Sequence, residues 1–387
     1  MRVKKLSRKQ KGRLIVLITL SFFAVFFAFL SRSVAQTLIT QQVAERWGER
    51  GFGQVSAFVP EHRGFSGDFG RDFQNAMDGS FVEQGLNLGD AEHAWTFAYH
   101  AEGGVLEARS LYRGPISVHA SGIGGNFFFF YPVTLINGSY LPRESINRDL
   151  VFIDEMVAWE LFGARDVTGM ELIFEGRHYV IAGVFRHFDD RFSQRARPDL
   201  PQVFFYYDEL EHLVGGLRVT TIHAVLPNSI RGFAGQLLSS TLETAGLEEG
   251  DYLLVNHNER YRFLPLLRIV RDFGARSMQD TGMRLPPWEN AARMTEDFAA
   301  LYLLFALLFA TLPVFSLCYF AVWRFRKRKW RMRHLITLAD NKREAKREVM
   351  WQQAEQRRMY TEQTEQFTVE QIIKESREEE EKNEKDA

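Results

Sequence analysis

The sequence has no lysine between Val34 and Asp297, although both ends of the chain contain several. This central region contains 23 Arg against 35 Asp plus Glu, a net charge of −12, whereas the whole chain has a net charge of −1. So acidic a region repels phosphate backbones, which argues against binding to nucleic acid. The single cysteine, Cys318, excludes an intrachain disulfide, so packing alone must stabilise any folded domain.

The motifs of common catalytic centres are also missing. There is no Gly-Lys-Ser/Thr phosphate loop, and residues 122–126 lack the spacing of a dinucleotide loop. No serine occupies a Gly-x-Ser-x-Gly turn, and Cys318 lies in an apolar run. His187, Asp189 and Asp190 are metal-ligand types without a second ligand cluster, so a polar surface loop is the better interpretation. We expect no enzyme activity, catalytic residue, metal or cofactor.

Two long apolar segments are present. Residues 14–30 contain no charge, and at about 1.5 Å per residue they span roughly 26 Å, enough for a membrane helix. A cleaved signal peptide is the alternative, because residues 33–35 are small, but the apolar run is longer than usual. Residues 298–323 form the second segment, which contains Pro313, a residue that membrane helices tolerate.

Positive charge flanks both segments on one side. Seven basic residues and no acid precede Leu14, seven basic residues follow Trp323 within residues 324–333, and Glu296 and Asp297 lie at the other end of the second segment. Because the flank richer in Lys and Arg stays inside, we predict a multi-pass plasma-membrane protein with both termini cytoplasmic. The expected regions are a cytoplasmic basic segment (1–13), a membrane helix (14–33), an extracytoplasmic domain (34–297), a second membrane helix (298–323) and a charged helical cytoplasmic tail with a disordered end (324–387).

The expected extracytoplasmic domain contains strand and helix patterns in alternation. Apolar alternation and β-branched or aromatic content predict strands over residues 96–99, 127–133, 150–153, 171–174 and 178–185. Helical spacing is present in residues 36–50, which would continue the first membrane helix, and in 156–162, ending at Gly163, 233–245 and 261–273. Residues 122–126 are expected to be a turn that enters a strand buried on both faces at 127–130. Strands interleaved with few helices predict an α+β domain.

Within residues 127–185, short motifs follow one another in order. An aromatic stretch precedes Leu135, Gly138 and Leu141, and a predicted helix then ends in Leu-Phe-Gly at 161–163. Gly169 precedes an apolar hairpin, and the last strand contains Val-Ile-Ala-Gly-Val at 180–184. This order resembles the extracytoplasmic domain of the MacB/FtsX-like permeases of ABC transporters, and a weaker resemblance continues through residues 201–205. The matching residues support folding, so the resemblance supplies no site residue.

The resemblance implies a function. It implies a non-catalytic, permease-like membrane subunit of an ABC-type transporter or mechanotransmission complex, whose outer domain docks an adaptor or substrate. The implied partners are an ABC ATPase subunit, a further permease chain, a membrane-fusion-type adaptor and membrane lipid, in an oligomer. The family usually has four membrane helices, whereas two apolar segments are found here, so direct contact with the ATPase stays open.

Two alternatives to the permease-like function stay open as well. One is a membrane-anchored extracellular sensor or scaffold that signals through its cytoplasmic tail. The other is an extracellular hydrolase tethered to the membrane at both ends.

Overall fold

The computed structural model describes residues 7–48, 51–85, 94–143, 145–277, 283–327 and 340–355. The chain divides into two compact units, Met1–Pro313 and Val314–Ala387. In the second unit, the described residues are the end of helix α12 and an exposed helical segment at 340–355. The remainder of the predicted tail lies outside the described residues.

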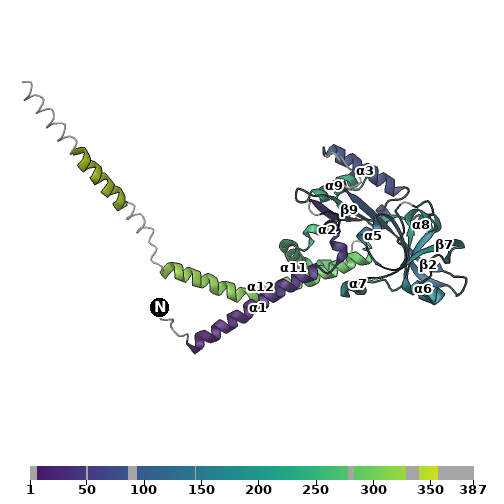
Figure 1. Cartoon of the computed structure of the whole chain (residues 1–387), viewed down its shortest axis with the longest axis horizontal. Helices are drawn as coiled ribbons and strands as arrows, with labels where there is room; N and C mark the ends of the chain where they lie inside the picture. Colours follow the sequence, from purple (N-terminus) through teal and green to yellow (C-terminus); the bar gives the residue numbers. More distant parts are fainter. Residues whose placement is uncertain are drawn as a thin grey trace, which may run out of the picture. The chain divides into compact units, whose positions relative to one another are not determined.

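A ten-stranded mixed sheet forms the centre of the first unit (Figure 1). The strand order is β10-β1-β9-β2-β3-β8-β5-β7-β4, with β6 paired to β7. The pairs β3–β8 and β5–β7 are parallel and the other pairs are antiparallel. The strands are β1 (Phe52–Phe58), β2 (Thr96–Ala108), β3 (Ile116–Gly125), β4 (Thr134–Gly138), β5 (Leu150–Asp154), β6 (Glu171–Phe174), β7 (Arg177–Arg186), β8 (Gln202–Tyr206), β9 (Val219–Pro227) and β10 (Leu253–Asn256).

Separate cores cover the two faces of the sheet, because successive strand residues point to opposite sides. In β2, Phe97 and Tyr99 belong to a large core shared with α3 (Phe69–Glu83), α6 (Glu155–Phe162), α8 (Tyr207–Val214) and α9 (Phe233–Thr244). Ala98, between them in sequence, faces a second core with α2 (Val43–Trp47), α5 (Phe127–Phe130) and the start of α12 (Pro287–Lys327). This arrangement is the α+β fold predicted from the sequence.

Further helices belong to the first unit. They are the 3-10 helices η1 (Ile39–Gln41) and η2 (Glu61–Arg63), and the helices α7 (Arg191–Ala196), α10 (His257–Arg260) and α11 (Phe263–Ser277).

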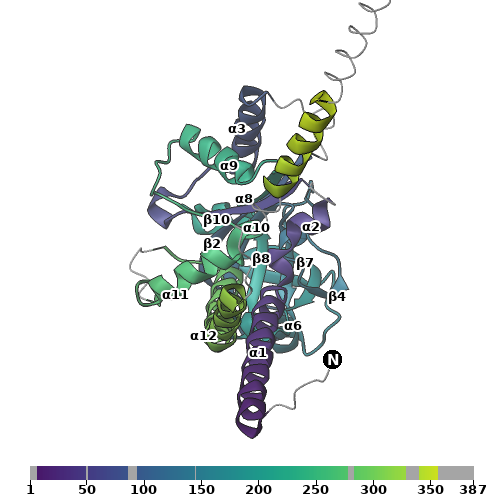
Figure 2. The same ribbon diagram turned by 90° about the vertical axis from the view of Figure 1, so that its left-hand side faces the viewer.

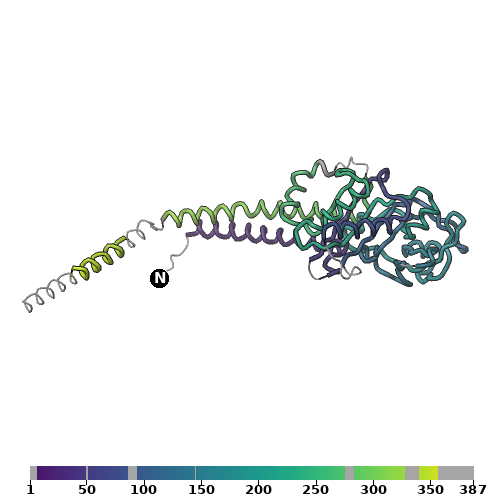
Figure 3. The backbone as a smooth tube through the Cα atoms, turned by 90° about the horizontal axis from the view of Figure 1, so that it is seen from above, coloured from purple at the N-terminus to yellow at the C-terminus, as the bar shows by residue number. Residues whose placement is uncertain are grey.

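Helices α1 (Arg8–Ala35) and α12 are the two described helices that are long and apolar enough to cross a membrane. They pack side by side (Figure 3), with the rings of Phe27 and Phe309 stacked at 5.6 Å. Nearer the sheet, Ser31 Oγ donates a hydrogen bond to the carbonyl of Ala299 at 2.8 Å. Helix α12 continues through Pro313. Within the first unit, α1 and the part of α12 up to Pro313 therefore run antiparallel beside the sheet domain.

Most of the predicted elements are confirmed. The strands at 96–99, 150–153, 171–174 and 178–185 lie in β2, β5, β6 and β7, and the helices at 156–162, 233–245 and 261–273 correspond to α6, α9 and α11. Gly163 ends α6 in the left-handed conformation, with φ of 72°. The helix expected over 36–50 is wrong in extent, because α1 stops at Ala35 and only η1 and α2 follow before residue 48.

The strand predicted at 127–133 is wrong. Residues 122–125 belong to β3, which ends at Gly125 with φ of 65°, where a Cβ would lie 2.5 Å from the carbonyl oxygen of Phe97. The chain turns at Asn126 and forms the helical turn α5. Phe127 and Phe130 are the buried members of this turn, a spacing of three that suits a helix rather than the alternation of a strand.

Candidate functional site: the junction between the membrane helices and the sheet

Helix α12 begins inside the sheet domain, before its apolar segment. Pro287 is its first residue, where the fixed φ of proline favours a helix start and the missing N–H costs no hydrogen bond. The ring of Trp288 is buried against His100 and Tyr131, at centroid distances of 5.0 and 4.9 Å. Because this first turn is part of the core, α12 is anchored in the sheet domain before it reaches the segment that could cross a membrane.

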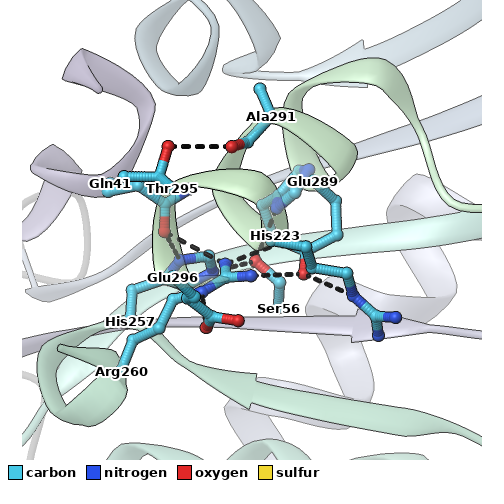
Figure 4. Close-up of polar contacts among 10 residues, drawn as sticks. Gln41, Ser56, His223, His257, Arg260, Glu289, Ala291, Thr295 and Glu296 are labelled. Atoms are coloured by element: carbon cyan, nitrogen blue, oxygen red, sulfur yellow. Dashed lines mark hydrogen bonds and ion pairs between the residues drawn. The ribbon is translucent and has the colours of Figure 1, made fainter. Parts of the chain in front are cut away.

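A buried arginine joins the first turns of α12 to the rest of the domain (Figure 4). Arg260, at the end of α10, donates two hydrogen bonds to the Glu289 carboxylate, at 2.8 and 2.6 Å. Its Nε donates to Glu296, and its Nη1 donates to Gln41 Oε1 at 3.2 Å. Arg293 adds an ion pair to Glu289 at 3.3 Å. The junction cluster, as we name this group with an adjoining histidine, consists of Gln41, His257, Arg260, Glu289, Arg293 and Glu296.

The charges of the junction cluster balance, because two guanidinium groups face two carboxylates. The side chains of Arg260 and Glu289 are only 3% and 1% exposed, so each charge depends on its partners rather than on water. Burial by itself would lower the pKa of Arg260, but the carboxylates of Glu289 and Glu296 outweigh it and raise that pKa above its ordinary value. The planar guanidinium fits a carboxylate through two parallel hydrogen bonds, a geometry that lysine cannot supply.

A chain of hydrogen bonds runs from the junction cluster into the sheet (Figure 4). His257 Nδ1 lies 2.6 Å from Gln41 Oε1, and this oxygen already accepts from Arg260, so His257 carries its proton on Nδ1. Its Nε2 then accepts from Ser56 Oγ at 2.7 Å, and Ser56 accepts from His223 Nδ1 at 2.6 Å. The chain therefore links η1, α10, β1 and β9.

The histidines near the junction cluster are held neutral by burial. Burial lowers the pKa of His223 from 6.5 to about 3, and it lowers the pKa of His257 well below 6.5, with Arg260 adding to the latter effect. The pKa of His100, which contacts Trp288, falls to about 4 for the same reason. A neutral His257 agrees with its hydrogen bonds, because one ring nitrogen donates and the other accepts.

Helix α1, the first of the two long apolar helices, is attached to the sheet in a different way. Helix α1 ends at Ala35, and the chain reaches β1 through η1 and α2. The buried side chain of Gln54 fixes this connection, because its Oε1 accepts from the N–H of Val43 at 3.0 Å and its Nε2 donates to the carbonyl of Thr40 at 2.8 Å. Gln41 of the junction cluster belongs to the same connection. Both long apolar helices therefore meet the sheet in one region.

Of the three candidate metal-ligand residues, His187 and Asp190 form side-chain hydrogen bonds within the fold, and Asp189 is exposed. His187 Nε2 lies 3.1 Å from Asp154 Oδ2, and Asp190 caps α7 by accepting from the N–H of Phe192 at 3.0 Å. His187 is buried, so the interpretation of this segment as a surface loop is wrong for that residue. Within the part of the chain that the structure describes, no group of three or more His, Cys, Asp or Glu side chains could hold a metal ion.

The junction cluster was not predicted from the sequence, where no site residue was assigned. Glu296 was identified only as a charge bordering the second apolar segment, and Arg260 lies 36 residues before it. Gln41 lies 219 residues from Arg260, so no local spacing connects them. Two features of the sequence could have pointed to this region. The basic residues of 34–297 are all arginine apart from histidine, and a Pro-Pro-Trp-Glu stretch at 286–289 lies shortly before the second apolar segment.

The combination of Ser56 with two histidines resembles the composition of a hydrolytic centre. However, Ser56 is fully buried and its hydroxyl is engaged on both sides by imidazole nitrogens. A hydrolytic serine needs access to a substrate carbonyl, which this position does not give. The arrangement is suited to holding β1, β9 and α10 together.

Comparisons with known proteins concern the fold. No protein-family model matches the sequence, and no curated protein sequence matches it. The chain is similar to the extracellular domain of the noncanonic ABC-type transporter YknZ from Gram-positive bacteria, with 13% identity and a TM-score of 0.36 over 52% of this chain and 100% of that one. It is also similar to the periplasmic region of MacB from Actinobacillus actinomycetemcomitans, with 16% identity and a TM-score of 0.36 over 61% of this chain and 99% of that one.

Proposed function

We propose that this chain is a non-catalytic, permease-like membrane subunit of an ABC-type transporter or mechanotransmission complex. The assignment to ABC systems rests on the order of motifs in residues 127–185. Two glycines of these motifs, Gly138 and Gly183, face each other across β4 and β7. A Cβ at Gly138 would lie 2.3 Å from the carbonyl oxygen of Ala182, so the close approach of these strands requires glycine.

The observation that carries the transmitting role is the continuity of α12. The same helix contributes Trp288 to the core of the sheet, Glu289 and Glu296 to the junction cluster, and residues 298–313 to the pair with α1. A helix is stiff over this length, and its buried charges cannot separate from Arg260 without a large cost. A shift or tilt of α12 in the membrane would therefore displace the sheet.

The proposed topology places the sheet domain outside the cell and both termini in the cytoplasm. It follows the distribution of Lys and Arg around the two apolar segments. The outer domain would then dock an adaptor or a substrate, and the cytoplasmic segments would meet an ABC ATPase directly or through a second permease chain. The proposed oligomer supplies the membrane helices that complete such a complex.

Labelling of single cysteines in intact cells tests the topology. In a Cys318→Ser background, Ile146→Cys places a thiol on the sheet domain, at a side chain that is 100% exposed, whereas Ser7→Cys and Gln352→Cys place thiols in the two terminal regions. A membrane-impermeant maleimide should label position 146 in intact cells and positions 7 and 352 only after lysis. Labelling of position 7 or 352 in intact cells would contradict the proposed topology.

Purification of the tagged chain in mild detergent, followed by mass spectrometry, tests the complex. Recovery of an ABC ATPase, with or without a four-helix permease and an adaptor, supports the proposal. The same purification from cells carrying Arg260→Met shows whether the partners need an intact junction cluster. Recovery of signalling proteins without any ATPase would favour a sensor or scaffold instead.

A further inference from the structure

Helix α11 is amphipathic in a way that the packing of the sheet domain does not explain. Its apolar residues, including Leu266, Val270 and Phe273, recur at spacings of three and four, and Arg268 and Arg271 occupy the other side. A helix of a soluble domain normally buries its apolar face in the core. Here only the middle of that face is covered.

The covered part of α11 rests on α12 at the start of its apolar segment. Leu266 is buried in a cluster with Ala299 and Ala300 of α12. In Figures 1 and 2, α11 lies crosswise beside the α1 and α12 pair, where that pair meets the sheet domain. On either side of this crossing, apolar side chains are left open, because Phe263 is 52% exposed and Phe273 is 55% exposed.

The pairing of α1 with α12 fixes the position at which α11 crosses them, measured along the axis of the pair. Ala299, beneath α11, receives the hydrogen bond of Ser31, and residue 30 ends the uncharged segment of α1. The crossing therefore lies at the level where both helices change from apolar to polar sequence. That level corresponds to the boundary between acyl chains and headgroups.

An apolar groove continues from α11 onto the candidate membrane-spanning surface. It has a volume of about 390 Å³ and is lined almost entirely by apolar side chains. Val270 and Phe273 of α11 and Leu301 and Leu304 of α12 contribute to it. Since Leu301 and Leu304 are exposed on the helix that would cross the bilayer, lipid that covers them also reaches α11.

The charge of α11 differs from that of the domain around it. Three arginines, Arg262, Arg268 and Arg271, lie exposed in and just before the helix, and Asp272 is the only acid between residues 262 and 277. Arg271 pairs with Asp272 at 2.7 Å and Arg262 lies 3.6 Å from Glu259, so the excess positive charge of the helix rests chiefly on Arg268. The domain as a whole has a net charge of −12, so this positive group stands beside the expected membrane surface. Basic side chains close to a bilayer surface are attracted to anionic headgroups.

We propose that α11 is an interfacial helix that binds the outer surface of the membrane, with Phe263 and Phe273 inserted at the acyl boundary and its arginines on anionic phospholipid headgroups. Helices of this kind bury their apolar face by about 5–10 Å. The proposal rests on the membrane placement of α1 and α12 proposed above. In this position α11 holds the sheet domain at a fixed height over the bilayer.

Fluorescence quenching in liposomes tests the proposal with the full-length chain. In a Cys318→Ser background, Phe273→Cys carries an environment-sensitive fluorophore, and lipids brominated near the headgroup act as quenchers. Val82→Cys is the matched control, because α3 has the same length of 15 residues as α11 and Val82 is 77% exposed. Phe22→Cys, on the exposed surface of α1 at the middle of its uncharged segment, reports on the membrane span itself and is read with a second set of lipids, brominated deep in the acyl chains.

We expect the label at position 273 to lose most of its fluorescence and the label at position 82 to lose almost none. Replacing anionic by zwitterionic lipid should reduce quenching at 273, and Arg268→Gln with Arg271→Gln should abolish this dependence on lipid charge.

Equal quenching at 273 and 82, together with strong quenching at 22, would overturn the interfacial helix and leave the membrane span intact. Absence of quenching at 22 would overturn the membrane placement as well. Equal quenching in both lipids would overturn the preference for anionic headgroups.

Discussion

The two long apolar helices are attached to the sheet domain by different chemistry. Helix α12 enters the domain without interruption, and its first turns are held by buried ion pairs to Arg260. Helix α1 stops at Ala35, and the connection after it is held by neutral amide hydrogen bonds from Gln54. One attachment is a continuous, charged helix, and the other is an interrupted, neutral segment.

This difference predicts that the sheet follows α12 more closely than it follows α1. Separating buried opposite charges leaves each of them without compensation, whereas losing one neutral hydrogen bond costs far less. In addition, a helix transmits tilt along its axis, and an irregular segment can absorb part of it. Motion that starts in the membrane would therefore reach the sheet mainly through α12, with α1 as the more adaptable support.

Replacing Arg260 by methionine should give the largest effect. Arg260→Met leaves the carboxylates of Glu289 and Glu296 buried without their main partner, and breaking such a pair costs about 3–5 kcal/mol of unfolding free energy. Denaturant unfolding of the full chain in detergent, followed by tryptophan fluorescence, measures this loss. Trp288 directly precedes Glu289, a partner of Arg260, and should contribute to this signal.

Two further variants separate the charge effect from the loss of a large side chain. Adding Glu289→Gln and Glu296→Gln to Arg260→Met removes the two buried carboxylate charges and should restore part of the stability. Arg231→Met disrupts the exposed ion pair with Glu259 and should change stability little, because exposed pairs contribute little. Equal losses of unfolding free energy for Arg260→Met and Arg231→Met would show that burial does not strengthen the ion pairs of Arg260. The attachment of α12 would then have no advantage from its charges.

The sequence was informative where structure is determined locally. Helix α6 and its end at Gly163, and the hairpin of β6 and β7, follow from apolar periodicity and from glycine. Residues 127–130 show the limit of such reasoning. Their aromatic content favours a strand, but Gly125 ends β3 just before them and the turn at Asn126 starts a helical turn instead.

The junction cluster could not be found in this way. Arg260, Glu289 and Gln41 come from three segments that meet only after the sheet has formed, and none of them belongs to a recognisable motif. Their charges look like ordinary surface charges in the sequence. Only burial distinguishes them, and burial here depends on where α12 begins, inside the sheet domain rather than at the membrane.

Protonation of His100 should weaken the attachment of α12 next most strongly. His100 contacts Trp288, and burial lowers its pKa from 6.5 to about 4, an effect that Glu102 opposes and His119 increases. Because the folded state binds the proton less readily than the unfolded state, stability should fall as the pH drops from 6.5 to about 4. At about 1.4 kcal/mol per pH unit, this residue alone would account for about 3 kcal/mol.

Denaturant unfolding at a series of pH values measures this dependence. His100→Phe keeps a ring of similar shape without a titrating group, so it should reduce the slope between pH 6.5 and 4. His62→Gln, at an exposed site in η2, is the control and should leave the slope as it is. The same slope in His100→Phe and the unmodified chain would show that His100 does not resist protonation in the fold.

The smallest of the three effects should come from the attachment of α1. Gln54→Leu removes the partners of the Val43 N–H and the Thr40 carbonyl, and each buried group left unpaired costs about 1–3 kcal/mol before relaxation. The segment can relax and admit water, so we expect a total loss of about 2 kcal/mol. Gln74→Leu, at an exposed position of α3, is the matched control.

Hydrogen exchange shows where each loss occurs, and so it tests the comparison directly. Gln54→Leu should speed exchange in residues 39–47 and leave residues 288–296 protected, because Arg260 still holds the first turns of α12. Arg260→Met should speed exchange in residues 288–296 most. Gln41 accepts hydrogen bonds from both Arg260 and His257, so a modest increase near residue 41 is expected in that variant too. If Gln54→Leu released both segments equally, the two attachments would behave as one cooperative unit, and α1 would transmit motion to the sheet as directly as α12.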